Sequence, residues 1–160
     1  MYVPGAFALK DSTAIADMIA THDFALLVSI LDCAPFASHL PLLHDPNDGP
    51  HGTLYGHVAR PNPHWHGFDG ATEALAIFSG PHAYISPSWY PAREAVPTWN
   101  YAAVHAYGRP VVVDDPGAVR DHLAHLGDGA CLQGALLLRL FEPLDLEVLL
   151  VILLVRRHFG

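Results

Sequence analysis

The most suggestive polar group in the sequence is a single arginine that directly follows an expected strand. Arg60 comes after the alternating segment 53–59 and is the only lysine or arginine between Lys10 and Arg93. An arginine binds phosphate well when hydroxyls and amides are grouped beside it, and Asn62 supplies an amide. The alternative is an ordinary surface arginine in a turn, and the spacing alone does not separate the two.

A second group of chemically interesting residues lies in SPSWYPAREAVPTWNY, residues 86–101. This stretch holds two of the three tryptophans and three prolines, although prolines disrupt the strand pairing that aromatic residues favour. A flat ring system could lie against such aromatic surface, with Thr98 and Asn100 bound to its polar edge. The alternative is a proline-ordered loop that closes the end of a barrel, and the residues by themselves favour this alternative.

Other chemistry lacks the motifs that would support it. Three histidines, His57, His64 and His66, lie close enough in the sequence to suggest zinc, but neither HExxH nor a mixed His/Cys set is present. No serine lies in a GxSxG motif, and Cys33 has no basic neighbour that would activate its thiol. We therefore predict no metal site and leave the catalytic residue unassigned.

The alternation of apolar residues predicts a mainly β chain with two or three helices (α+β), folded as a small antiparallel barrel. The helices, each with a capping residue near its start, are expected over residues 11–21 and 116–126. The strands are expected over residues 24–31, 36–43, 53–59, 73–78, 82–86 and 98–113. Ser79-Gly80-Pro81 is expected to separate the strands on either side of it. A buried final strand is expected within residues 148–155.

The composition predicts one domain whose surface is partly covered. At 160 residues the chain is long enough for a hydrophobic core, and 51% of its residues are apolar. Charged residues make up 15%, against roughly 25% in typical globular chains. We infer from this low share that a second copy of the chain covers part of the surface.

The charge balance argues against direct contact with DNA. Eight lysines and arginines stand against sixteen aspartates and glutamates, for a net charge of −8. Duplex binding draws on clustered cations, and no such cluster occurs. The two cysteines form no CxxC motif and the N-terminus has no secretory signal, so a cytoplasmic location is expected. No membrane span is expected, because the most apolar run, 148–155, is far shorter than the about 20 residues that a membrane helix needs.

Four segments together resemble a known family. They occur in order as MYVPGAF (1–7), ASHLP (37–41), GTLYGHVARPNPHW (52–65), and SPSWYP followed by VPTWNYAAVHAYG (86–108). These segments resemble the PaiB-type FMN-binding negative transcriptional regulators, from residue 1 to about residue 126. The resemblance implies a flavin split β-barrel, related to pyridoxamine-phosphate oxidases and flavin reductases. It also implies a homodimer with FMN at the subunit interface.

The same resemblance implies which residues bind FMN. Ser38 and His39 match the strand that faces the flavin in the family. Three residues match the part of related barrels that holds the FMN phosphate: Ala59, Arg60 and Asn62. Six residues match the aromatic motifs, near the ring or across the dimer: Ser86, Ser88, Trp89, Thr98, Trp99 and Asn100.

The resemblance also divides the chain. Residues 1–126 are predicted to form the FMN-binding split barrel, and residues 127–160 an atypical segment that is either a final strand or an altered end. The link PAREA between Tyr90 and Val96 is shorter than in the family, and the terminal K-L-S-Q-N-like motif is not recognisable in residues 127–160.

Three hypotheses for the function follow. The first is an FMN-binding regulatory module of the PaiB type. The second is an FMN-dependent oxidoreductase or flavin reductase, in which His39, His57 or Tyr101 would donate a proton. The third is a folded relative whose altered C-terminal segment prevents cofactor binding.

Overall fold

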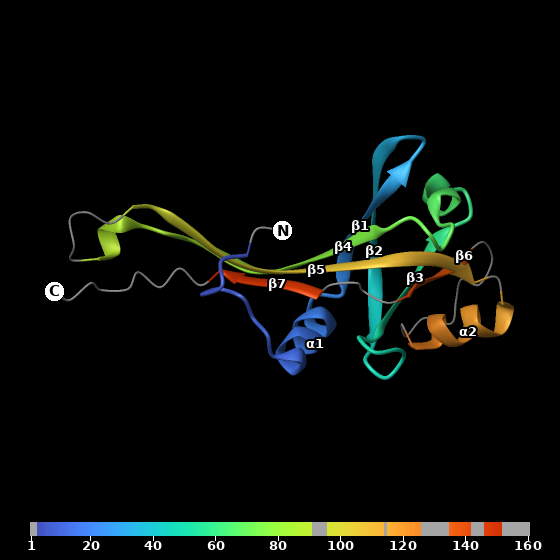
Figure 1. Ribbon diagram of the computed structural model, residues 1–160, viewed down its shortest axis with the longest axis horizontal. Coiled ribbons are helices and arrows are strands. Elements are labelled where there is room, and N and C mark those ends of the chain that lie inside the picture. Colours follow the sequence, from blue (N-terminus) through green and yellow to red (C-terminus); the bar gives the residue numbers. More distant parts are fainter. Residues whose placement is uncertain (1–2, 91–95, 114, 126–134, 142–145, 152–160) are drawn as a thin grey trace.

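The protein folds as an antiparallel β-barrel, as the sequence predicts. The computed structural model describes residues 3–90, 96–113, 115–125, 135–141 and 146–151. Neighbouring strands pair in the order β4-β1-β2-β3-β6-β5, and the barrel closes because β4 also pairs with β5 (Figure 1). The strands are β1 (Phe24–Leu31), β2 (Ala34–Asp45), β3 (Thr53–Ala59), β4 (Ala74–Ile85), β5 (Thr98–Val113), β6 (Ala135–Phe141) and β7 (Leu146–Val151).

Two helices lie close to their predicted bounds because acidic side chains cap them. Helix α1 spans Ser12–Thr21, and the Asp11 carboxylate accepts hydrogen bonds from the Thr13 and Ala14 amides. Helix α2 spans Pro116–His125, and Asp115 accepts from the Ala118 amide. In the part of the chain that the structure describes, neither helix has the length and apolar character to cross a membrane.

Strand β2 changes partners in its middle, and this change makes the barrel split. It pairs with β1 from Ala34 to Pro41, and with β3 from Leu42 onward. Pro41 lies where one ladder ends, a position that tolerates a residue without an amide hydrogen. At Gly56, opposite Leu42, an added Cβ would lie 2.5 Å from a Leu42 methyl carbon, so a larger residue would force the buried Leu42 side chain to shift.

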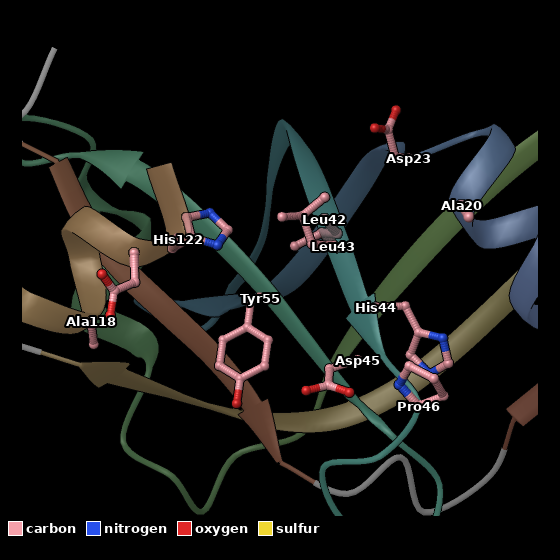
Figure 2. A pocket seen from close by; sticks show the side chains of 11 residues that line it. Ala20, Asp23, Leu42, Leu43, His44, Asp45, Pro46, Tyr55, Ala118 and His122 are labelled. Carbon is pink, nitrogen blue, oxygen red and sulfur yellow. The ribbon is translucent and has the colours of Figure 1, made fainter. Parts of the chain in front are cut away.

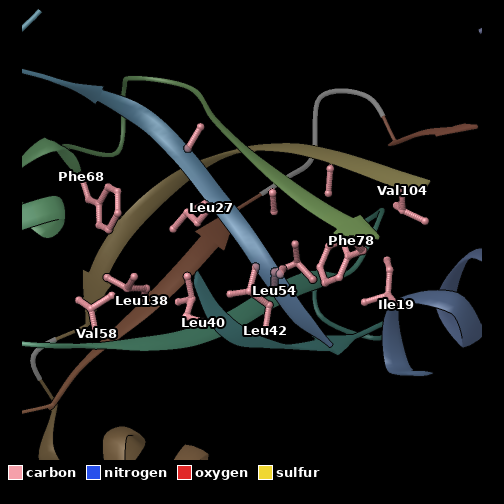
Figure 3. Packing of buried hydrophobic residues seen from close by; sticks show 14 of the residues in the cluster. Ile19, Leu27, Leu40, Leu42, Leu54, Val58, Phe68, Phe78, Val104 and Leu138 are labelled. Carbon is pink, nitrogen blue, oxygen red and sulfur yellow. The ribbon is translucent and has the colours of Figure 1, made fainter. Parts of the chain in front are cut away.

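The core fills the barrel between the inward faces of the strands. Alternate residues of β2 and β3 point inward, so Leu40, Leu42, Leu54 and Val58 are buried. Figure 3 shows Ile19 of α1 at one end of this cluster, which also contains the residues Leu27, Phe68, Phe78, Val104 and Leu138. Helix α1 therefore closes one end of the barrel with its apolar side.

One predicted boundary is wrong: residues 73–78 and 82–86 belong to the single strand β4. Ser79 pairs with Ala103 and His82 with Tyr101, so β4 carries one extra residue as a β-bulge. Pro81 lies in this bulge, where its lack of an amide hydrogen breaks no ladder hydrogen bond. At Gly80 a Cβ would lie 3.1 Å from the Ala102 carbonyl oxygen, so the bulge packs closely against β5.

Strands β4 and β5 continue beyond the barrel as a two-stranded arm. Strand β5 has its predicted bounds and passes through Gly108, where its pairing with β4 ends and its pairing with β6 begins at Arg109. At the other end the arm carries the short 3₁₀ helix η2 (Pro87–Trp89), well away from α2 (Figure 1).

Strands β6 and β7 lie in the segment predicted to be atypical. Strand β7 (Leu146–Val151) overlaps the predicted final strand 148–155 and pairs with β5. Residues 152–155 of that prediction lie outside the described residues. Strand β6 was not anticipated, and it lies between β3 and β5.

Truncating the core strand β2 tests this packing. Leu42→Ala should lower the free energy of unfolding by about 2–5 kcal/mol, because it removes a fully buried side chain where β2 changes partners. Ile30→Ala, at a half-exposed site on β1, is the control and should cost under about 1 kcal/mol. Urea unfolding of both variants measures the difference, and equal losses would contradict the assigned burial.

Candidate functional site

A rigid turn presents Arg60 at the end of β3. The Asn62 amide donates to the Ala59 carbonyl at 2.8 Å, and the Asn62 side-chain oxygen accepts from the His64 amide at 3.0 Å. This capping starts the 3₁₀ helix η1 (Pro63–Gly67). The Trp65 indole N–H donates to the Arg60 carbonyl at 3.0 Å. The Arg60 side chain is exposed, so the turn holds its backbone while the guanidinium faces outward.

Inside the barrel, the same turn is anchored by a buried polar network. His64 is fully buried, and its Nδ1 lies 2.9 Å from the Ser38 hydroxyl while its Nε2 lies 2.8 Å from the Ser29 hydroxyl. The Asn62 side-chain amide donates to the Ser38 hydroxyl at 3.1 Å. The network thus ties η1 to β1 and β2.

Two aromatic rings pack against the His64 ring at tilted angles. The rings of Phe36 and Phe68 each have their centroids 4.8 Å from the centroid of the imidazole. Burial lowers the pKa of His64 below its ordinary value of 6.5, so the ring is neutral at neutral pH. A neutral imidazole donates from one nitrogen and accepts at the other, which satisfies both serine contacts.

Two further histidines lie at outward-facing positions of β2 and β3. His39 is exposed there and its ring stacks on Phe24, with centroids 6.2 Å apart. On β3, His57 lies edge-on to His122 of α2, with ring centroids 5.7 Å apart. Burial lowers the pKa of His57, and its Nδ1 has no hydrogen-bond partner among the described residues.

The arm carries the second predicted set of residues. Ser86 caps η2 by accepting from the Ser88 amide, and Trp89 is 66% exposed. Trp99 is 53% exposed and stacks with His82, with ring centroids 5.7 Å apart. The flat aromatic surface of the arm therefore faces outward rather than into the barrel.

Two polar atoms on the arm are buried and unsatisfied. Among the described residues, neither Thr98 Oγ1 nor Asn100 Oδ1 has a hydrogen-bond partner. A buried polar atom without a partner costs about 1–3 kcal/mol, so such atoms in a native protein call for an explanation.

The structure brings together some of the predicted residues and separates others. Ser38 and Asn62 are in direct contact, and Ala59 and Arg60 belong to the same turn, whereas His39 lies on the outer face. The other six residues lie on the arm. Ala59 pairs with Ala135, near the Val113 end of β5, while Thr98 begins that strand. The length of β5 between these ends is about 50 Å, so one flavin cannot touch both groups within one chain.

A cavity of about 660 Å³ lies between α1, the β2–β3 hairpin and α2, and the sequence did not suggest it (Figure 2). It is lined by Leu43, His44, Asp45, Tyr55 and His122, among others. These residues come from distant parts of the chain, so no local motif marks them.

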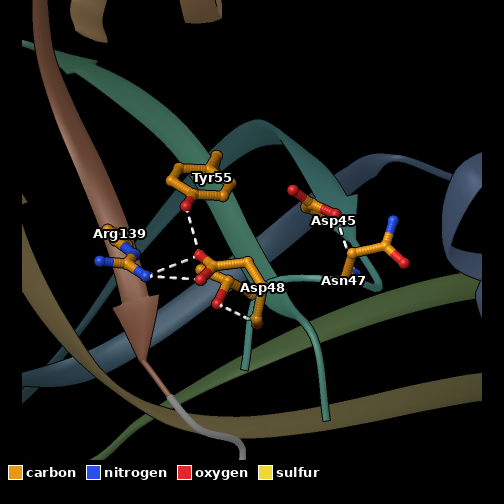
Figure 4. Close-up of polar contacts among 6 residues, drawn as sticks. Asp45, Asn47, Asp48, Tyr55 and Arg139 are labelled. Atoms are coloured by element: carbon orange, nitrogen blue, oxygen red, sulfur yellow. Dashed lines mark hydrogen bonds and ion pairs between the residues drawn. The ribbon is translucent and has the colours of Figure 1, made fainter. Parts of the chain in front are cut away.

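A polar cluster adjoins this cavity and fastens β6 to the β2–β3 loop (Figure 4). Arg139 donates to both carboxylate oxygens of Asp48, at 2.8 and 2.7 Å, and the Tyr55 hydroxyl donates to the same carboxylate. These hydrogen bonds, that of Tyr55 first, lower the pKa of Asp48, while burial raises the pKa of Tyr55. In the described part of the chain, no cluster of histidine, cysteine and carboxylate residues could hold a metal ion.

Solved structures of two flavoproteins share the fold of this barrel. The flavocytochrome Anf3 from Azotobacter vinelandii superposes with a TM-score of 0.74 at 13% identity, covering 93% of this chain and 72% of that chain. The FAD and heme binding protein from Mycobacterium smegmatis superposes with a TM-score of 0.70 at 15% identity, covering 89% and 72%. At such identities the likeness establishes the fold alone.

Sequence comparison identifies the family. Residues 1–130 match a family described as "Putative FMN-binding domain". The Bacillus subtilis "Protease synthase and sporulation protein PAI 2" is 41% identical over 114 residues, which cover 71% of this chain and 54% of that protein. The chain belongs to the PaiB-type FMN-binding family, and FMN is its cofactor.

The chain spans about half the length of the curated relatives that it matches. The share is 54% for the Bacillus protein and 49% for a second relative, the uncharacterized protein YKL070W of Saccharomyces cerevisiae, which is 37% identical over 83 residues.

Two histidines, the half-buried His57 and the buried His64, predict a loss of stability in acid. Their folded-state pKa lies below 6.5, so the unfolded chain binds more protons as the pH falls through about 6.5, and the free energy of unfolding decreases. Each histidine contributes a slope of at most about 1.4 kcal/mol per pH unit. Urea unfolding of His57→Gln between about pH 5 and pH 7.5 should show a shallower slope than the native chain. His66→Gln, at an exposed site, is the control, and an equal change in both variants would contradict the assignment.

Proposed function

We propose that the chain is an FMN-binding regulatory module that acts as a homodimer. In this proposal each FMN lies between the Arg60 turn of one protomer and the aromatic arm of its partner. One observation carries the proposal: the two groups of predicted site residues lie at opposite ends of β5, so that only a second copy can complete the site.

The Arg60 turn fits the phosphate end of FMN. The guanidinium stands outside the barrel, where phosphate keeps access to water, and it offers paired donors to two phosphate oxygens. The exposed Ala59 has a small side chain, so a ligand can approach the strand end closely. His39 lies on the outward face of the neighbouring strand and would border the flavin on that side.

The arm fits the ring end of FMN. Thr98 Oγ1 and Asn100 Oδ1 are buried without a partner among the described residues, and the polar edge of an isoalloxazine offers both donors and acceptors. Trp99 provides a flat face for stacking. Ser86 and Ser88 lie at the base of η2 with exposed hydroxyls 2.8 Å apart, and Trp89 follows them.

A dimer also accounts for the exposed apolar surface of the arm. Tyr84, Trp89, Val96 and Trp99 are each between 47% and 69% exposed on this segment. Several large apolar side chains exposed on one segment are what an interface between two copies would cover. The low share of charged residues in the chain agrees with such coverage.

The regulatory role is supported by the relative and limited by charge. The Bacillus protein is named for protease synthesis and sporulation. With a net charge of −8, direct reading of an operator is disfavoured, so we propose control through a partner protein that senses the bound flavin.

A second candidate function is that of a flavin-dependent oxidoreductase. It is favoured by the fold shared with a flavocytochrome. Bound FMN would supply the redox chemistry, while the chain would bind and orient it and exclude water. Oxidation of NADPH by the FMN-loaded protein, followed at the nicotinamide absorbance, separates this function from the regulatory one.

Removing the arginine tests the phosphate assignment. Arg60→Ala should weaken FMN binding by about 10- to 100-fold, since a hydrogen-bonded charge pair is lost. Its affinity for riboflavin, which has no phosphate, should stay unchanged. Arg120→Ala, at an exposed arginine of α2, is the control. Flavin fluorescence quenching measures each affinity. No saturable FMN binding by the native chain would refute the proposed function.

Mixing two defective variants tests the shared site. Arg60→Ala and Asn100→Ala damage opposite ends, so a mixed dimer has one doubly damaged and one intact site. After unfolding and refolding of an equal mixture, about a quarter of all sites should bind FMN with native affinity. If the Arg60 turn and the arm of each site came from the same protomer, every site would keep one damaged end and no native site would reappear. Sedimentation of the native chain should give the mass of a dimer.

A further inference from the structure

We propose that His64 is a positioning residue: from inside the barrel it holds the Arg60 turn in the geometry that selects flavins carrying a phosphate. This inference rests on the proposed phosphate-binding role of Arg60. It assigns the preference for FMN over riboflavin partly to a side chain that the flavin cannot reach.

The burial of His64 excludes direct contact with a ligand. Its exposed fraction is 0%, and the rings of Phe36 and Phe68 pack against it. Both ring nitrogens are already hydrogen-bonded to serine hydroxyls. A buried polar group with every partner satisfied orders the segments that it joins.

The hydrogen-bond network of His64 joins two segments at the point where the barrel splits. The described pairing of β2 with β3 ends at Leu42 and Gly56, so beyond this point backbone hydrogen bonds no longer join them. Ser38 lies on the part of β2 that pairs with β1 and not with β3, and Asn62 follows the end of β3. The hydrogen bonds from Asn62 and His64 to Ser38 therefore replace the missing ladder.

The second serine extends the anchor to β1. Ser29 binds the other ring nitrogen of His64, and at Gly67 an added Cβ would lie 3.0 Å from the Ile30 carbonyl oxygen. Helix η1 thus packs closely on β1, and a larger residue at Gly67 would require β1 or η1 to shift.

The amide of Asn62 transmits this anchoring to Arg60. Its oxygen accepts from the His64 amide and its nitrogen donates to Ser38, so the side chain is held at both ends. The backbone amide of Asn62 bonds to Ala59, which leaves Arg60 between two fixed residues. A preorganised arginine loses less conformational entropy when it binds phosphate, and binds it more tightly.

The test compares FMN with riboflavin in variants of the network. In His64→Leu we expect FMN affinity to fall by about 10-fold with riboflavin affinity nearly unchanged, because only the phosphate contact depends on the turn. His64→Asn can keep a polar atom near the position of Nδ1 and should restore most of the preference. Ser29→Ala is a smaller change that removes the hydrogen bond to His64 Nε2. It should lower FMN affinity in the same selective way, and it covers the case in which His64→Leu fails to fold.

Two controls separate positioning from loss of stability. Ile19→Ala removes a buried side chain of α1 away from the turn, so it should lower the melting temperature but keep the preference for FMN. The double variant Arg60→Ala/His64→Leu should bind FMN no more weakly than Arg60→Ala alone, because the histidine acts through the arginine. The indole N–H resonance of Trp65, which donates to the Arg60 carbonyl, should shift in flavin-free His64→Leu.

The outcomes distinguish the two proposals. If the native chain prefers FMN and Arg60→Ala abolishes this preference, but both His64→Leu and Ser29→Ala retain it, the role of His64 is overturned while the phosphate site stands. If the native chain binds both flavins equally or neither, the phosphate site itself is wrong, and the role of His64 fails with it.

Discussion

Strand β2 hydrogen-bonds to β1 along its first part and to β3 along its last part, and the rest of the structure depends on this division. A strand that leaves its neighbour exposes unpaired backbone groups and an opening into the core. The chain fills this opening with η1, whose side chains bond to Ser29 and Ser38. This arrangement buries the polar ring of His64 completely. The burial is tolerated because both ring nitrogens are hydrogen-bonded.

The same division determines how the candidate site is built. The turn that presents Arg60 lies at the split, so the proposed phosphate-binding group sits on a turn that hydrogen bonds join to β1 and β2. The aromatic arm, by contrast, leaves the barrel and has two buried polar atoms without hydrogen-bond partners among the described residues. The anchored turn and the unsatisfied arm lie at opposite ends of β5, as the proposed site shared between two copies requires.

The C-terminal strand β6 completes the barrel with few specific residues. Strand β6 needs an extended segment with apolar residues on the inward face, which Leu138 provides, and an anchor to the β2–β3 loop, which Arg139 provides. Pairing with β3 and β5 satisfies its backbone whatever its other side chains are. A segment without the terminal motif of the family therefore still completes the barrel.

The sequence by itself determined the features that depend on neighbouring residues. The caps at Asp11 and Asp115 set the helix starts, a mostly apolar run marked β1, and apolar alternation marked β3. The family motifs then identified FMN. Each of these features is encoded within a few residues, where propensity and hydrogen bonding act locally.

Only the tertiary structure decided the rest. Strand β4 is continuous because its bulge packs on β5, and His64 is an anchor because Ser29 and Ser38 lie beside it. The cavity and the pairing of Asp48 with Arg139 join segments about 90 residues apart. The distance between Arg60 and Asn100 follows from strand order and register. Such features depend on which strands become neighbours, and closing the barrel, rather than any short stretch of sequence, determines that.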